Sequence, residues 1–201
     1  MIIQPIVEGQ GDVDAVPVLL RRICYELGCC LTAAVAAPIR IPRSKMVQEA
    51  EIRRYARIGS FHPGCDLVLL FMDVDDDCAK ELSALIRPWI EAEQLGVRFE
   101  VVAIPREFEC WIIAALESLR GKRGIDANAA SHGDPEQVRD AKGYITGRMV
   151  GTTKYQETSD QAALISLVDL ELVRDRCPSF RRVVSKVAEC AQEVARGGIT
   201  T

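Results

Sequence analysis

The sequence lacks long apolar runs and a basic amino-terminal stretch, although 48% of its 201 residues are hydrophobic. Its first segment, Met1–Glu8, contains a glutamine and ends in an acid, so it falls far short of the roughly 20 apolar residues that cross a bilayer. We therefore expect neither a signal peptide nor a membrane-spanning segment. The expected protein is cytoplasmic and has no membrane partner.

Histidine is scarce, and the cysteines are not arranged as metal-binding pairs. The chain has eight cysteines and two histidines, and no two cysteines have the Cys-x-x-Cys spacing. Neither His62 nor His132 has zinc-ligand spacing to a cysteine. Several cysteines fall inside helical patterns, so we expect buried thiols in a reducing compartment rather than a disulfide framework.

The sequence also has no internal repeat and no low-complexity tract, and its length suits one substantial core. Short apolar runs alternate with helical periodicities about four times along the chain. This alternation predicts an α/β fold, a Rossmann-like and mostly parallel sheet of about four strands flanked by helices. The predicted strands are Ile2–Val7, the alanine-rich Leu31–Pro38 together with Ile39 and Ile41, Leu67–Met72 and Val97–Ile104.

Three parts are expected along the chain. Residues 1–120 form the α/β domain. Residues 121–158 are rich in Gly, Asp, Asn and Ser, which predicts an irregular or lid-like insertion with one short helix near Pro135–Lys142. Residues 159–201 form a C-terminal helical pair packed on the same domain, with one helix from about Asp160 to Asp175 and another from about Ser179.

The apolar run Leu67–Met72 is followed directly by Asp73, Asp75, Asp76 and Asp77. This pattern predicts a buried strand with a carboxylate cluster at its carboxyl end. Carboxylates so close together repel one another, so they are kept together mainly where a cation or a proton neutralises them. Their hard oxygen atoms suit Mg²⁺ or Mn²⁺. The alternative is that Asp76 and Asp77 cap the next helix while the other two are solvated.

A second acidic position follows the first strand, where Glu8 begins a glycine-rich turn. In parallel sheets, ligands bind at the carboxyl ends of strands where the strand order reverses. If the first and third strands are neighbours, Glu8 meets Asp73 and Asp75 there. Glu107 or Glu109, in the first turn of a later helix, would join the same rim, although interaction with the helix dipole also explains them.

Basic residues are concentrated after the second strand. Arg43 and Lys45 lie at the mouth of a loop that leads into a helix, where contact with a phosphate and plain solvation are both open. The sequence leaves four later residues without a functional role. For these we expect helix caps or a solvated helix face: Asp160, Gln161, Arg181 and Arg182.

Two of these features resemble the signatures of the Toprim fold, which topoisomerases, DnaG-type primases and OLD-type nucleases share. They are Glu8 within Ile6–Asp12 and the pair Asp73 and Asp75 after an apolar strand. The whole chain resembles a family of small stand-alone Toprim-like proteins of uncharacterised function, often encoded beside ABC-type or AAA ATPases in bacterial defence operons. Further segments that carry this resemblance are Pro42–Lys45, Glu107–Trp111, Tyr155, Asp160-Gln161 and Pro178–Phe180.

The resemblance implies that Glu8 transfers protons and that Asp73 and Asp75 hold Mg²⁺ or Mn²⁺. Glu109, or Glu107, would complete a second metal position, and Arg43 or Lys45 would hold a backbone phosphate. No tyrosine is placed like a topoisomerase nucleophile, and no zinc module like that of a primase is present. The expected activity is therefore metal-dependent hydrolysis of a nucleic acid, DNA before RNA, with a possible partner ATPase.

Two alternatives remain open on the sequence. The chain is either a non-catalytic, metal-stabilised module that docks on an ATPase or a nucleic acid, or a phosphatase of the haloacid dehalogenase type. The phosphatase would use Asp73 as nucleophile and Asp75 as acid.

Overall fold

Two buried parallel strands, β1 (Ile2–Val7) and β4 (Leu67–Asp73), form the centre of the fold. The computed structural model describes residues 1–75 and 78–197, so the predicted caps Asp76 and Asp77 lie outside the described residues. All six residues of β4 before Asp73 are buried. Burial on both faces explains why this strand has a continuous apolar run and no alternation with polar residues.

The strand pairs that the described residues form are parallel, in the order β2-β1-β4-β5. The predicted second strand is instead two strands of two residues that line the same side of β1. They are β2 (Ala34–Val35) and β3 (Ile39–Arg40). The direction of winding reverses between β1 and β4. The expected parallel α/β sheet is confirmed, with five strands in the described part of the chain instead of about four.

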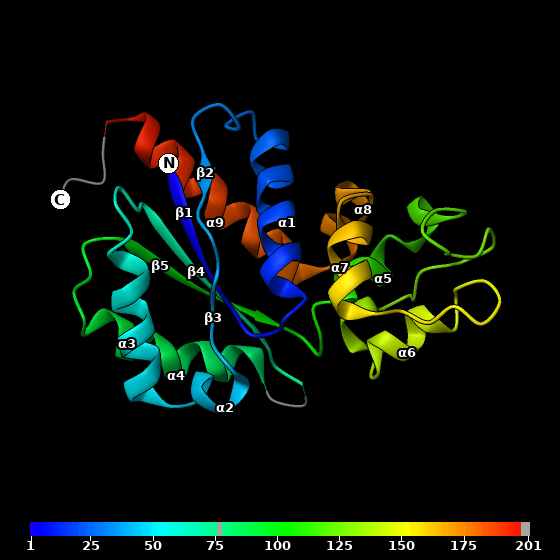
Figure 1. Ribbon diagram of the computed structural model, residues 1–201. Coiled ribbons are helices and arrows are strands. Elements are labelled where there is room, and N and C mark those ends of the chain that lie inside the picture. Colours follow the sequence, from blue (N-terminus) through cyan, green and yellow to red (C-terminus); the bar gives the residue numbers. More distant parts are fainter. Residues whose placement is uncertain (76–77, 198–201) are drawn as a thin grey trace.

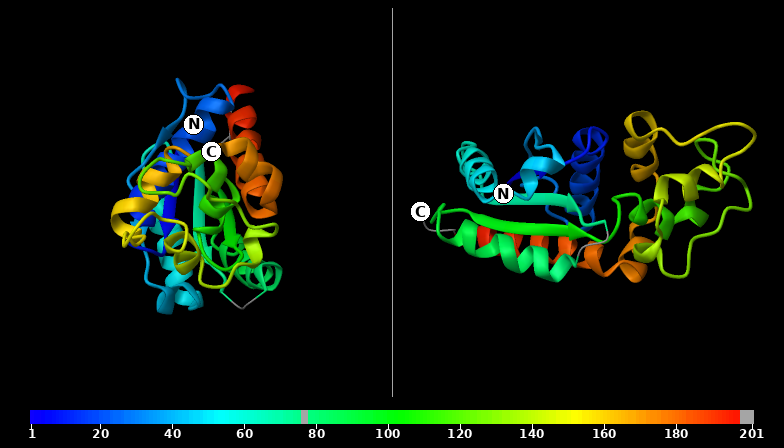
Figure 2. Two further views of the ribbon diagram at one scale, coloured as in Figure 1. Left: turned by 90° about the vertical axis from the view of Figure 1, so that its right-hand side faces the viewer. Right: turned by 90° about the horizontal axis from the view of Figure 1, so that it is seen from below.

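Helices cover both faces of the sheet (Figures 1 and 2). Alternate residues of β4 point into two separate apolar cores, with Leu69 and Phe71 in one and Leu70 and Met72 in the other. The first core lies under α1 (Asp12–Glu26) and α9 (Pro178–Ala195), and the second under α2 (Arg43–Met46), α3 (Glu49–Ser60) and α4 (Ala79–Glu91). In the described part of the chain, no helix combines the length and apolar character needed to cross a membrane.

After β5 (Arg98–Ile104), the chain builds a helical region beyond the carboxyl ends of the strands (Figure 1). Residues 121–158 contain a 3-10 turn and α6 in place of the single short helix predicted there. Their Ile125 and Ile145 join the same core as α1. The elements of this region are α5 (Cys110–Ala114), η1 (Leu116–Leu119), η2 (Pro135–Gln137), α6 (Ala141–Thr146), α7 (Glu157–Ile165) and α8 (Leu170–Arg176).

The predicted helix from Asp160 to Asp175 is two helices, because Asp169 starts a new one. Its side chain accepts hydrogen bonds from the N–H groups of Glu171 and Leu172 at 2.9 and 3.3 Å. An aspartate that satisfies the first N–H groups in this way is a helix N-cap. The C-terminal part therefore comprises α7, α8 and α9 rather than a pair of helices.

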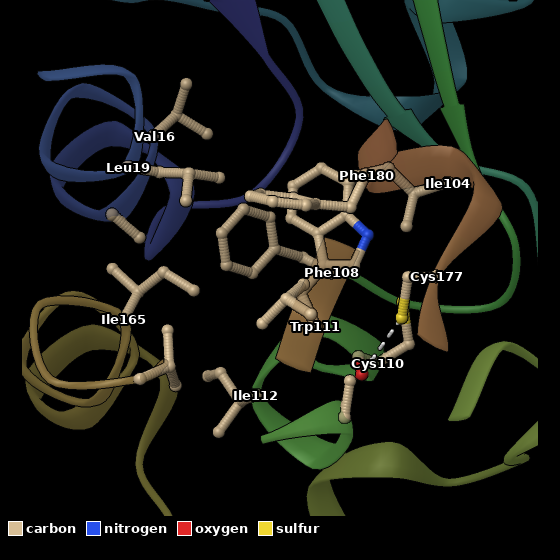
Figure 3. Packing of buried hydrophobic residues seen from close by; sticks show 14 of the residues in the cluster. Val16, Leu19, Ile104, Phe108, Cys110, Trp111, Ile112, Ile165, Cys177 and Phe180 are labelled. Atoms are coloured by element: carbon tan, nitrogen blue, oxygen red, sulfur yellow. Dashed lines mark hydrogen bonds between the residues drawn. The ribbon is translucent and has the colours of Figure 1, made fainter. Parts of the chain in front are cut away.

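Trp111 joins the helical region to the sheet (Figure 3). Its buried ring packs edge-on against Phe71 of β4 and Phe180 of α9, with ring centroids 6.4 and 5.5 Å apart. The indole N–H donates to Ser179 Oγ at 2.9 Å, and the Ser179 N–H donates to the buried Glu136 carboxylate at 2.8 Å. Aromatic packing and satisfied polar groups thus fix α5, η2 and α9 against the sheet.

Candidate functional site

A pocket of about 420 Å³ opens at the carboxyl ends of β1 and β4, where the winding of the sheet reverses. Glu8 directly follows β1, and Asp73 is the last residue of β4. The pocket combines five carboxylates with three basic side chains. Its polar and charged side chains are Glu8, Gln10, Asp12, Arg40, Arg43, Asp73, Glu109, Lys142, Glu157 and Gln161.

Glu8 lies beside Arg43 in this pocket. Arg43 Nη1 is 3.6 Å from Glu8 Oε2, and it also donates a hydrogen bond to the main-chain carbonyl of Asp73. Glu8 Oε2 is buried and has no hydrogen-bond partner among the described residues. Burial raises the pKa of Glu8 above its ordinary value, although the positive charge of Arg43 acts in the opposite direction.

Asp73 lies at the end of β4 among the other carboxylates of the pocket. Burial raises its pKa well above the ordinary value, and the negative charges of Asp12, Glu109 and Glu8 raise it further. Carboxylates that share a small, partly dry space cannot all ionise without a compensating cation. This end of β4 therefore has the electrostatic character expected of a proton- or cation-binding site.

Glu109 immediately precedes α5 and is almost completely buried, with 1% of its surface exposed. The Tyr155 hydroxyl donates a hydrogen bond to Glu109 Oε1 at 3.0 Å. Burial raises the pKa of Glu109 to about 7, against the lowering effect of Lys142. Glu109 thus changes its charge near neutral pH.

Lys142, from α6, brings a positive charge to the pocket that the sequence did not predict. Its Nζ lies 3.0 Å from Glu157, 3.5 Å from Glu107 and 4.0 Å from Glu109. Burial alone would lower the pKa of Lys142, but these glutamates outweigh it and raise the pKa. The lysine belongs to the segment predicted as irregular, and no motif in the sequence marks it.

Asp12 and Gln161 form the back of the pocket. The Gly9 N–H and Gln161 Nε2 donate to the two oxygens of Asp12 at 2.8 and 2.9 Å. Gln161 is 1% exposed, and its Oε1 has no hydrogen-bond partner among the described residues. The sequence predicted a solvated or capping role for Gln161, and burial in the pocket shows that this prediction is wrong.

The glycine turn after β1 allows this close approach. A Cβ atom on Gly11 would lie 2.0 Å from Gln161 Oε1 and 2.6 Å from Glu157 Cγ. A Cβ atom on Gly9 would lie 2.9 Å from Asp12 Oδ2. Glycine is required at both positions because side chains pack closely against the backbone there. At Gly11 the reason is not a left-handed conformation, since its φ is −67°.

The other predicted site residues lie outside this pocket. Asp75 is exposed, has a φ of 48° and lines a neighbouring depression of about 160 Å³ together with Glu107. The regular alternation of β4 ends at Asp73, so residues two apart no longer share a face. Lys45 pairs with Glu51 at 3.5 Å and does not line the pocket.

Glu107 accepts a hydrogen bond from the Ala141 N–H at 3.0 Å, at the start of α6. Asp160, for which the sequence predicted a cap or a solvated position, accepts a hydrogen bond from the Gln156 N–H at 2.8 Å, which is a capping role. Arg181 donates to two carbonyls at the end of α8, and Arg182 is exposed on α9.

The pocket offers the oxygen atoms that Mg²⁺ and Mn²⁺ prefer, but its carboxylates are spread around it. Among residues 1–75 and 78–197, no three His, Cys, Asp or Glu side chains are already placed to hold a metal ion. Two oxygens of this pocket, Glu8 Oε2 and Gln161 Oε1, are buried without a hydrogen bond from the described residues, so each could accept a cation or a donor group. The donor atoms are therefore of the chemical kind that binds a hard divalent cation, although within the described residues they are not grouped as a ready metal site.

Comparison with curated proteins and with solved structures gave no match. Comparison with protein families gave a match over residues 7–188, which begins at the last residue of β1 and covers the other strands, the pocket and most of α9. This chain belongs to the family described as Domain of unknown function (DUF4276).

Proposed function

We propose that this chain hydrolyses phosphodiester bonds of a nucleic acid, DNA in preference to RNA, with Mg²⁺ or Mn²⁺ as cofactor. The observation that carries the proposal is the buried Glu8 Oε2, which lacks a hydrogen bond within the described chain and lies 3.6 Å from Arg43. An acid and a cation side by side at the switch point of a parallel sheet suit the attack of water on a phosphate.

Glu8 takes the proton from the attacking water. Its pKa is raised by burial, and a general base works best when its pKa lies near the operating pH. Arg43, anchored on the Asp73 carbonyl, is positioned to contact a phosphate oxygen next to Glu8. A fixed guanidinium of this kind stabilises the negative charge that develops on the phosphate.

Asp73 and Asp12 would hold the divalent cation, with Gln161 Oε1 and Glu109 as further oxygen donors. Bound there, the cation would offset the repulsion among the carboxylates and polarise the phosphate. Asp75, the second acid of the Asp-x-Asp pair, would join only if its backbone turned toward the pocket from the neighbouring depression.

From the resemblance to stand-alone Toprim-like proteins, we further propose that this activity is cytoplasmic and operates with a partner ATPase of a defence system. The phosphatase alternative needs Asp73 and Asp75 in one cavity, and their separation into two cavities argues against it, as it does against a cation held by these two acids together. A metal-stabilised binding module remains a second candidate, because Lys142 already neutralises part of the pocket through Glu157 and Glu109.

The first experiment compares Glu8→Gln, Asp73→Asn and Asp75→Asn in the purified chain, with the exposed Glu171→Gln as matched control. Mn²⁺ binding is measured by calorimetry, and cleavage is measured on labelled single- and double-stranded DNA and RNA. We expect Glu8→Gln to keep Mn²⁺ binding and to lose cleavage by about 100-fold or more, the usual contribution of a general base.

Asp73→Asn is expected to lose both Mn²⁺ binding and cleavage, whereas Glu171→Gln keeps both. Asp75→Asn decides whether that residue reaches the cation, since loss of binding would place it among the ligands. Wild-type cleavage by Glu8→Gln contradicts the assigned base, and absence of Mn²⁺ binding contradicts the metal site. Metal binding with no cleavage, alone or with the partner ATPase, would select the binding module.

A further inference from the structure

The outer edge of β5 is the longest open strand edge in the described part of the sheet. β5 has seven residues and pairs there with β4 only; its last three residues are buried, so the edge is open over residues 98–101, whereas β2 and β3 at the opposite edge have two residues each. Figure 2 (right) shows β5 at the border of the sheet. An exposed strand edge of this length readily pairs with another strand, and proteins normally shorten, cover or charge such edges. The open edge of β5 is therefore a candidate site for pairing with another strand.

The hydrogen-bond register shows which groups of β5 are available. The Arg98 N–H donates to the Asp66 carbonyl at 3.2 Å, and the Val74 N–H donates to the Ile104 carbonyl at 2.9 Å. Because main-chain groups alternate in direction along a parallel strand, even-numbered residues of β5 bond to β4. Phe99 and Val101 consequently direct their N–H and C=O groups outward.

Two adjoining cavities, of about 760 and 570 Å³, run along this edge. The half-buried Phe99 and Val101 line them, and α4 and α9 stand on either side. The groove thus offers apolar contact beside unpaired main-chain groups. That combination suits an extended segment that adds to the sheet.

The groove is basic at one end and acidic at the other. Lys80 on α4 and Arg182 on α9 are exposed near the carboxyl end of β5, and Arg87 is exposed on α4 one helical turn before Glu91. None of these three forms an ion pair within residues 1–75 and 78–197. Glu91 and Glu193 line the groove near the amino end together with Arg98, which pairs with Glu193 at 3.0 Å and leaves an excess of negative charge there. Both helices run opposite to β5, as the pairs Lys186–Glu100 and Glu193–Arg98 show for α9.

We propose that this groove binds β5 of a second copy of the chain, in an antiparallel, two-fold symmetric pair. A two-fold axis through the centre of the edge places the basic end of each copy against the acidic end of the other. A parallel arrangement would place like charges together, so the charge distribution selects the antiparallel one. The two sheets then form one continuous sheet, and this proposal does not rest on the proposed function.

Other occupants fit less well. A nucleic-acid backbone would satisfy Lys80, Arg87 and Arg182 but would meet Glu91 and Glu193 at the far end. It would also leave the outward main-chain groups of β5 without strand partners. A second copy matches both the charges and the hydrogen bonds.

The first test is the oligomeric state of the full chain, measured by sedimentation over a concentration series. Val101→Pro removes one outward N–H and leaves the ladder to β4 intact, because proline is tolerated on a strand edge. Val101→Thr is the matched control, since it keeps the N–H. We expect a dimer for the wild type and Val101→Thr, and a dimer dissociation constant raised about tenfold or more in Val101→Pro.

The second test exchanges charges between two preparations. One carries Arg87→Glu and Arg182→Glu, and the other carries Glu91→Lys and Glu193→Lys. Each alone should be monomeric because both ends then repel, whereas a 1:1 mixture should form heterodimers in native mass spectrometry. Circular dichroism and thermal unfolding verify that each variant is folded.

A monomeric wild type overturns the proposal, as does a folded Val101→Pro that dimerises like Val101→Thr. Mixed charge variants that stay monomeric overturn the antiparallel arrangement. A monomer whose affinity for DNA falls in the Arg87→Glu, Arg182→Glu variant would assign the groove to nucleic acid instead.

Discussion

At the scale of the residue, the protonation of Glu109 makes the free energy of unfolding depend on pH. Its pKa rises from the ordinary 4.5 to about 7 on burial, so the folded chain binds this proton more tightly than the unfolded chain. The resulting stabilisation is complete below pH 4.5 and is lost as the pH rises through 7. The change is up to about 3 kcal/mol, taking 1.36 kcal/mol for each pKa unit.

We therefore expect the free energy of unfolding, measured with urea in the presence of a chelator, to fall between pH 5 and 8. The neighbouring acids Glu8, Asp12 and Asp73 have pKa values raised in the same direction and add to this slope. Glu109→Gln should make the slope shallower by removing one proton from the linkage. An identical slope in that variant would show that Glu109 titrates normally.

A second prediction at this scale concerns Gly11 and the free energy of unfolding. Gly11→Ala places a methyl group 2.0 Å from Gln161 Oε1, so the back of the pocket must shift. Overpacking of this kind costs about 1–3 kcal/mol in the free energy of unfolding. Gly133→Ala is the control, because its Cβ would have no atom within 4 Å. Equal stability of the two variants in urea would contradict the tight packing at Gly11.

Part of the pocket is predictable from single positions in the sequence. Glu8 and Asp73 could be placed at one edge of the sheet because each follows an apolar run that reads as a parallel strand. Gln161 could not, because its contact with Asp12 spans 149 residues and has no local pattern. Asp75 was grouped with Asp73 because both closely follow the same apolar run, and nothing in that run indicates that the backbone turns at Asp75, where φ is 48°.

At the scale of the element, Ser179 holds three segments together. Ser179→Ala would leave the Trp111 indole N–H buried without a partner and would remove one of the two hydrogen bonds that Ser179 donates to Glu136 Oε1. Such a loss costs about 1–3 kcal/mol. We expect that decrease in urea unfolding, together with faster hydrogen exchange in residues 121–158. Ser185→Ala, at an exposed position of α9, is the control and should change neither measurement by a comparable amount.

Elements were predicted well where one pattern dominates and less well where two compete. β1 and β4 match their apolar runs, because burial on both faces leaves no other reading. The predicted helix from Asp160 to Asp175 was broken by Asp169, whose cap competes with a continuous apolar periodicity. The alanines of the second predicted strand have low strand propensity, and only four residues near it pair with β1.

At the scale of the whole molecule, the alternating pattern predicted the α/β class and the parallel sheet, because crossover connections are almost always right-handed and short. It did not predict how the region after α5 folds over the end of the sheet. That arrangement depends on Trp111, Ser179 and Glu136, which are distant in sequence and carry no periodic pattern.

The wide separation of the residues around the pocket also bears on when it forms during synthesis. A ribosome makes Glu8, Asp12 and Asp73 early, and the first strands can pair before the rest of the chain exists. Lys142, Glu157 and Gln161 arrive last, and only then does the acidic cluster receive its balancing lysine and its back wall. A chain that stops before Gln161 therefore contains the early acidic residues without all the groups that complete the pocket. The pocket is complete only after Gln161 has been made.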